Sequence, residues 1–148
     1  MKKFVITFLV TLTLFFVGIS ETNHTYAATN YSVKASAIAQ KYVGVPYKWG
    51  GISPSGFDCS GLVYYSFKQA GKPLPRTAGE MYRKGTAVSK KNLRNGDLVF
   101  FNTNKKGASH VGIYIGSNKF VHSSSKGVRI DSMSNPYWSK VYHGSKRM

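Results

Sequence analysis

The amino-acid sequence predicts an α+β domain, because helical patterns fill its first half and short stretches of strand character fill its second half. A chain of 148 residues with 42% hydrophobic and 14% aromatic residues has enough apolar side chains for one compact core. No internal repeat or low-complexity linker divides the chain. We therefore expect a single domain behind the N-terminal segment.

Three helices are expected, over residues 32–43, 58–70 and 77–85. The first has apolar residues at helical spacing and stops at Gly44. The second opens at Asp58, a good N-cap residue, and places Cys59 in its first turn on the apolar face. The third begins where Thr77 and Glu80 have the spacing of a capping box.

The second half of the chain has the period and the turn residues of an antiparallel meander. Strands are expected over residues 97–101, 110–115, 119–123, 128–130 and 140–143. Turn-forming residues separate them, notably at 104–107 and 116–118. Helices first and antiparallel strands afterwards indicate the α+β class.

The N-terminus has the outline of a secretory signal peptide. Lys2 and Lys3 precede an uncharged run over residues 4–19, and small residues follow up to Ala27. The run is shorter than the roughly 20 residues that a membrane-spanning helix needs. We expect residues 1–27 to be a signal peptide cleaved after Ala27, residues 28–148 to be the mature protein, and no stable membrane anchor to remain. The protein is then secreted, to the cell wall or the extracellular space.

The charge balance is strongly basic, with 21 lysines and arginines against 5 acidic residues and a net charge of +16. A chain of this kind is attracted to polyanions. No zinc-finger, helix-turn-helix or aromatic RNA-binding pattern is present, so nucleic acid is not the expected partner. For an exported monomer, anionic cell-wall polymers are the better candidate.

A single cysteine, Cys59, cannot form an internal disulfide. Its place at a helix N-terminus is one that lowers a thiol pKa and favours a nucleophilic thiolate. The alternative is an inert cysteine that acts as a small hydrophobic residue. A histidine able to act as a base decides between these two interpretations.

Two histidines supply that base and a third polar group, because His110 opens one apolar strand and His122 lies in the next. Side chains alternate along strands, so these two share a face only if the hairpin contains a bulge or an odd-numbered loop. A bulge at Gly116 meets that condition, and Gly112 leaves room for an imidazole. His143 is expected at the surface.

Six segments, in this order and spacing, resemble the NlpC-type cell-wall cysteine peptidases of the papain-like superfamily: YKWGG, FDCSGLV, LPRTA, GDLVFF, SHVGIYIG and FVHS. The similarity covers nearly all of residues 28–148. It implies a papain-like fold with the N-terminal helices packed on the C-terminal sheet. It also implies hydrolysis of the bond between γ-D-glutamate and a diamino acid in peptidoglycan stem peptides, without a cofactor or metal.

The resemblance assigns a role to each candidate site residue. Cys59 is the nucleophile, His110 the base, and His122 the group that orients the imidazole. Tyr47 matches a tyrosine near the thiol. Substrate binding is further assigned to Asp58 and Ser60, which match positions that hold the free amino end of the substrate, and to Ser109, which precedes the base.

Three alternatives stay open at this point. A thiol amidase or acyltransferase could use the same scaffold. The domain could be a non-catalytic envelope-binding module whose function is its charge, although the intact Cys59, His110 and His122 argue against this. The same three side chains could instead bind zinc in a three-ligand site.

Overall fold

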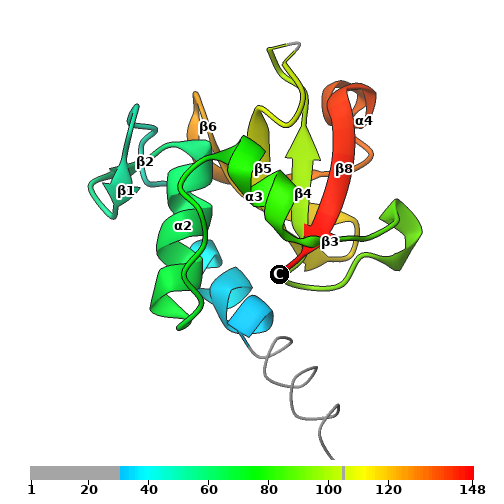
Figure 1. Ribbon diagram of the computed structural model, residues 1–148. Helices are drawn as coiled ribbons and strands as arrows, with labels where there is room; N and C mark the ends of the chain where they lie inside the picture. The colour runs from blue at the N-terminus through cyan, green and yellow to red at the C-terminus, as the bar shows by residue number, and fades with distance from the viewer. Residues whose placement is uncertain (1–30, 105) are drawn as a thin grey trace, which may run out of the picture.

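The computed structural model describes residues 31–104 and 106–148, which form helices packed against an antiparallel sheet (Figure 1). This confirms the predicted α+β class. The main sheet has the strand order β3 (Thr86–Ala87), β8 (Tyr142–Arg147), β4 (Leu98–Phe101), β5 (His110–Gly116), β6 (Lys119–Ser124), β7 (Gly127–Ser132). A small ribbon of β1 (Ile52–Ser53) and β2 (Gly56–Phe57) leads into the second helix.

The helices follow the predicted patterns closely. Residues 31–40 are helical and are followed by a turn that ends at Gly44. Helix α2 spans Cys59–Gln69 with Asp58 as its N-cap. Helix α3 spans Ala78–Lys84, and the Thr77 hydroxyl oxygen accepts a hydrogen bond from the Glu80 amide as a capping box requires.

The sheet separates two clusters of buried side chains. The larger cluster joins the sheet to the first helix and α2, which lie together beside it in Figure 1. Its sheet residues, such as Phe100 and Val111, alternate with those of the smaller cluster, such as Phe101 and Phe120, which contact Trp138. Helix α4 (Pro136–Val141) provides Trp138, so the far face of the sheet has its own cover.

The β5–β6 hairpin contains the predicted bulge. Ser117 and Asn118 form a two-residue turn with positive φ angles, and the register shifts between Tyr114 and Gly116. The extra residue restores the parity that a two-residue turn alone would break. His110 and His122 consequently lie on the same face of the sheet.

One predicted strand has the wrong bounds. Lys140 and Val141 belong to α4, and β8 begins only at Tyr142 and continues to Arg147. The Asn135 side chain caps α4 and Pro136 stands in its first turn, so a short helix displaces the start of the strand. The 3-10 turn η1 (Lys90–Asn92) and the edge strand β3 were not predicted.

The proposed signal peptide, residues 1–27, lies outside the described residues. Within residues 31–104 and 106–148, no helix is both long enough and apolar enough to cross a membrane.

Candidate active site

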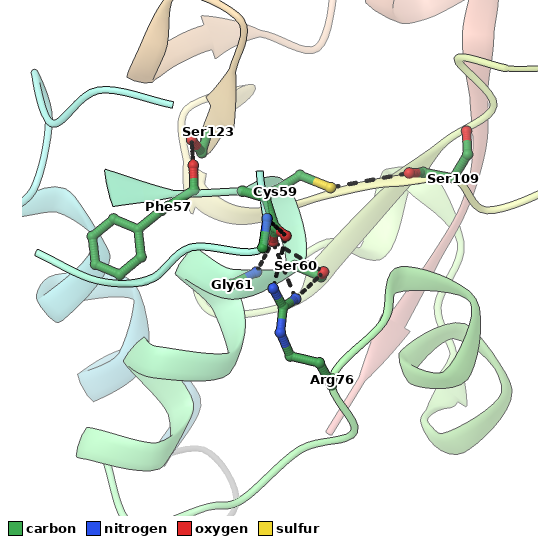
Figure 2. Close-up of polar contacts among 9 residues, drawn as sticks. Phe57, Cys59, Ser60, Gly61, Arg76, Ser109 and Ser123 are labelled. Carbon is green, nitrogen blue, oxygen red and sulfur yellow. Dashed lines mark hydrogen bonds and ion pairs between the residues drawn. The ribbon is translucent and has the colours of Figure 1, made fainter. Parts of the chain in front are cut away.

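Cys59 is the first residue of α2, and its position is fixed by the cap in front of it. Asp58 Oδ1 accepts a hydrogen bond of 2.6 Å from the Gly61 amide. The partly exposed thiol points toward the start of β5, where Sγ lies 4.0 Å from the carbonyl oxygen of Ser109 (Figure 2). A backbone hydrogen bond from Val111 also lowers the pKa of this thiol.

The thiol is not the low-pKa group that its helix position suggested. Burial raises the pKa of Cys59, and the charge of Asp58 adds to that effect, whereas backbone hydrogen bonds such as the one from Val111 oppose it only in part. The expectation of a lowered thiol pKa is therefore corrected. Desolvation outweighs the helix N-terminus, so the thiol needs a base to take its proton.

His110 and His122 form a directly hydrogen-bonded pair, with His110 Nε2 2.9 Å from His122 Nδ1. The pair continues to a third residue, because His122 Nε2 lies 2.8 Å from Oδ2 of Asp131 on β7. Asp131 in turn accepts a hydrogen bond of 3.0 Å from Arg129 Nη2. The structure thus brings the two predicted histidines together and adds a carboxylate and a guanidinium that the sequence did not indicate.

Burial determines the protonation of the two hydrogen-bonded histidines. Burial first, and the neighbouring His122 second, lower the pKa of His110 to about 3. Burial also lowers the pKa of His122, although the hydrogen bond and the charge of Asp131 work against it. Both imidazoles are therefore neutral near pH 7, which leaves His110 able to accept a proton.

Aromatic rings enclose the histidine pair. The Trp138 ring stacks on His110, with centroids 5.1 Å apart and planes at 24°, and meets His122 edge-on at 4.8 Å. Phe120 lies 4.6 Å from His122. With the surrounding fold, these rings leave His122 fully buried and His110 only 8% exposed. The apolar environment accounts for the low pKa of His110.

A second polar cluster surrounds the cap of α2. Arg76 donates to both carboxylate oxygens of Asp58, at 3.1 and 2.7 Å, and to the Ser60 hydroxyl at 2.7 Å (Figure 2). The amides of Gly50 and Gly61 and the Ser60 hydroxyl also donate to this carboxylate. Asp58 is therefore engaged on both oxygens before any substrate is bound.

The remaining predicted residues differ in their orientation. Burial raises the pKa of the Tyr47 hydroxyl, and the charge of the nearby Cys59 raises it further. The Ser109 hydroxyl instead accepts hydrogen bonds from the amides of Thr103 and Asn104 in its own loop. Ser109 faces the thiol with its carbonyl oxygen and holds the loop before β5 with its side chain.

Most of these groups border one open cleft of about 1230 Å³. The predicted residues Tyr47, Asp58, Cys59, Ser60, Ser109 and His110 line it, together with Arg76, Asp131 and Trp138. His122 is fully buried behind His110. A nucleophile at the cleft surface with a buried histidine chain behind it is an arrangement for thiol acyl transfer.

Zinc binding does not fit this geometry. Both ring nitrogens of His122 are occupied, one by His110 and one by Asp131. Among residues 31–104 and 106–148, no three His, Cys, Asp or Glu side chains are arranged to hold a metal ion.

Comparison with known proteins identifies the family of the chain. The family model described as NlpC/P60 matches residues 44–147, which include every residue of the cleft named above. The chain belongs to the NlpC/P60 family. Its likeness to that family, expected from six sequence segments, is therefore confirmed.

Relatives of this NlpC/P60 chain include named cell-wall enzymes. The chain is 47% identical over 126 residues to the murein DD-endopeptidase MepH of Escherichia coli, with 78% of the chain and 46% of MepH covered. It is 49% identical over 113 residues to a gamma-DL-glutamyl hydrolase of Bacillus subtilis, with 74% of the chain and 27% of the hydrolase covered. The chain thus spans less than half the length of either relative.

A solved structure shows the same fold. The NlpC/P60 family protein from Bacillus cereus superposes with a TM-score of 0.73 at 36% identity, covering 78% of this chain and 39% of that protein. The papain-like arrangement that the sequence predicted is confirmed at the level of the fold.

The sequence analysis did not identify four residues of the cleft: Arg76, Arg129, Asp131 and Trp138. Arg129 and Asp131 are two residues apart on β7 and so lie on the same face of that strand, a polar alternation typical of an edge strand. One signal was available, since β7 follows the His122 strand directly and its polar alternation falls in register with that histidine.

Proposed function

We propose that this protein is a secreted cysteine endopeptidase that cleaves peptidoglycan stem peptides at the bond between γ-D-glutamate and the diamino acid. The observation that carries the proposal is the position of Cys59 against the start of β5, where His110 begins a buried chain of hydrogen bonds. The names of the relatives, murein endopeptidase and gamma-DL-glutamyl hydrolase, support a peptidoglycan substrate.

The proposed chemistry uses Cys59 and His110 in both steps. His110 Nδ1 takes the thiol proton while Sγ attacks the scissile carbonyl. His110 then gives that proton to the departing amine as the C–N bond breaks, which leaves a thioester on Cys59. A water molecule, deprotonated by His110, attacks the thioester, and the thiol recovers its proton as it leaves.

Substrate binding is proposed for the residues around the thiol. Tyr47 positions the peptide beside Cys59, and Asp58 and Ser60 lie where the free amino end of the substrate would be held. Because Asp58 already accepts hydrogen bonds from Arg76 and two backbone amides, an amine would share that carboxylate rather than find it free. Ser109 contributes through the loop that it holds.

The name of one relative points to a second candidate for the peptide bond that is cleaved. MepH is named a DD-endopeptidase, which indicates a bond between two D-amino-acid centres rather than the γ-D-glutamyl bond. The engaged carboxylate of Asp58 is compatible with such a substrate, since a cross-link needs no free L-alanine amine.

Defined substrates distinguish these bonds. The protein is incubated with L-Ala-γ-D-Glu-diamino acid, with its N-acetylated form, and with a cross-linked stem-peptide dimer, and products are identified by mass spectrometry. We expect cleavage between residues two and three of the free peptide and slower cleavage after N-acetylation. Cleavage of the cross-link alone would assign the DD bond. A muramyl peptide is included as a fourth substrate, and release of its stem peptide from the sugar lactate, with the γ-D-glutamyl bond left whole, would assign the amidase.

We further propose that residues 1–27 direct export and are removed after Ala27. An intact-mass measurement on the secreted protein checks this, because the mature chain should begin at Ala28. A mass that retains residues 1–27 would contradict the proposal.

A further inference from the structure

Asp131 is the most buried carboxylate bordering the cleft. Its side chain is 14% exposed, whereas that of His122 is 0% exposed. Asp131 Oδ2 meets His122 Nε2 at 2.8 Å, and Oδ1 meets Arg129 Nη2 at 3.0 Å. Each oxygen of the carboxylate therefore has its own donor.

We propose that Asp131 is a positioning residue that fixes the tautomer of His122 and thereby keeps a lone pair on Nδ1 of His110. This inference rests on the proposed thiol mechanism, because it concerns the base that activates Cys59. It does not depend on which peptide bond is cut.

The donor and acceptor pattern leads to this conclusion. A carboxylate only accepts hydrogen bonds, so His122 carries its proton on Nε2. His122 Nδ1 is then an acceptor, and His110 must donate to it from Nε2. A neutral imidazole has one proton, so His110 Nδ1 is left with a lone pair. When the thiol reacts, its proton moves from Sγ to this lone pair, and no other group changes its protonation.

Within residues 31–104 and 106–148, no second carboxylate bonds to the histidine pair. The titratable and charged groups near the histidine pair come from five elements: Cys59 and its cap Asp58 at α2, His110 on β5, His122 on β6, Arg129 and Asp131 on β7, and Tyr137 beside Trp138 on α4. Asp58 is engaged by Arg76. Among the described residues, Asp131 is the one carboxylate that bonds to His122, and it can only accept a hydrogen bond.

Arg129 makes this arrangement testable. In Asp131→Asn, Arg129 can only donate and so takes the amide oxygen, which turns the amide NH₂ group toward His122. His122 must then accept at Nε2 and carry its proton on Nδ1. His110 becomes the acceptor at Nε2, and its own proton moves to Nδ1, where the thiol needs a lone pair. Asp131→Ala imposes no tautomer.

The test compares these two uncharged variants. Alkylation of Cys59 by iodoacetamide near neutral pH reports thiol activation without peptidoglycan, and kcat/KM on a stem peptide reports catalysis. We expect Asp131→Asn to be slower than Asp131→Ala in both assays, and about 100-fold slower than the wild type, since a positioned base contributes about 10²–10⁴-fold. The double variant Arg129→Met, Asp131→Asn should recover at least to the level of Asp131→Ala, because its amide is free to turn.

Two measurements keep the result interpretable. Long-range ¹H–¹⁵N correlation spectra of the histidines should show His110 protonated at Nε2 in the wild type and at Nδ1 in Asp131→Asn. Asp97→Asn is the matched control, because Asp97 also pairs with an arginine, Arg147, in the same sheet but lies outside the cleft. It should lower stability without slowing alkylation at temperatures where it is folded.

The opposite order overturns the inference. If Asp131→Asn reacts as fast as Asp131→Ala or faster, or if its His110 keeps the proton on Nε2, Asp131 only contributes an ion pair. If the wild type cuts no stem peptide while the order of alkylation rates holds, the proposed function fails and the role of Asp131 stands.

Discussion

At the scale of single residues, the site consists of a neutral thiol beside a neutral imidazole. Burial raises the pKa of Cys59 and lowers that of His110, so a preformed thiolate–imidazolium pair is not favoured. The same burial makes the proton transfer depend on geometry rather than on charge. Trp138 and Phe120, which pack against the histidine pair, provide part of this burial.

The pH dependence of Cys59 alkylation follows from this state. A thiol with a raised pKa gains thiolate only as the pH rises, so the rate with iodoacetamide should increase continuously beyond about pH 8.5, the ordinary cysteine value. A pH series with mass detection of the adduct checks this. A rate that reaches its plateau below pH 6 would indicate a thiolate–imidazolium pair instead.

At the scale of elements, the start of α2 is placed by a close backbone contact. A side chain at Gly61 would collide with the carbonyl oxygen of Gly51, in the loop just before β1. A side chain at Gly79 in α3 would meet only Arg83 Nη1, at 3.6 Å. Both glycines are helical, yet only Gly61 is needed for the approach of two segments. Gly61, two residues after Cys59, therefore has a structural reason to be a glycine.

Two glycine-to-alanine variants test this contact. Gly61→Ala should destabilise the protein by about 1–3 kcal/mol, the typical cost of overpacking, and should lower activity because Cys59 moves with the helix start. Gly79→Ala should leave stability unchanged or raise it by up to about 1 kcal/mol, because alanine favours helix. Urea unfolding measures both, and equal destabilisation by the two variants would contradict this assignment.

The elements also show what the sequence could and could not predict. Helix α2, the capping box of α3 and the β5–β6 bulge follow from local patterns, since caps, turns and side-chain parity are short-range properties. The start of the strand expected over 140–143 was wrong because Asn135 and Pro136 start a helix whose apolar residues are too few to show a period. Asp131 and Arg76 were missed because their partners come from distant segments that only the fold brings together.

At the scale of the whole molecule, the chain has a net charge of +16, and many of its basic residues lie outside the cleft. Lysines such as Lys84, Lys91 and Lys119 are exposed and do not border the cleft. We propose that this surface holds the protein on anionic wall polymers, an attraction that salt screens. Peptide cleavage depends instead on the buried chain behind Cys59, which salt screens poorly.

Wall association and peptide cleavage should therefore respond differently to salt. Sedimentation with purified walls should weaken between 0.1 M and 1 M salt, over which the Debye length falls from about 10 Å to about 3 Å, while turnover of a soluble peptide changes little. The triple variant Lys84→Glu, Lys91→Glu, Lys119→Glu should reproduce the high-salt behaviour at low salt. Arginine at the same three positions is the charge-preserving control. Binding that ignores both salt and charge reversal would point to a specific glycan- or peptide-binding surface.

The most direct test of the central claim is the digestion of purified peptidoglycan by the wild type and by Cys59→Ser, with new amino ends counted and identified by mass spectrometry. The account predicts new diamino-acid amino ends with the wild type. It also predicts a loss of several orders of magnitude in Cys59→Ser, because a hydroxyl is a far weaker nucleophile than a thiol beside the same base. Circular dichroism establishes that the variant is folded. A folded Cys59→Ser protein that releases the same ends at a comparable rate would contradict the thiol mechanism.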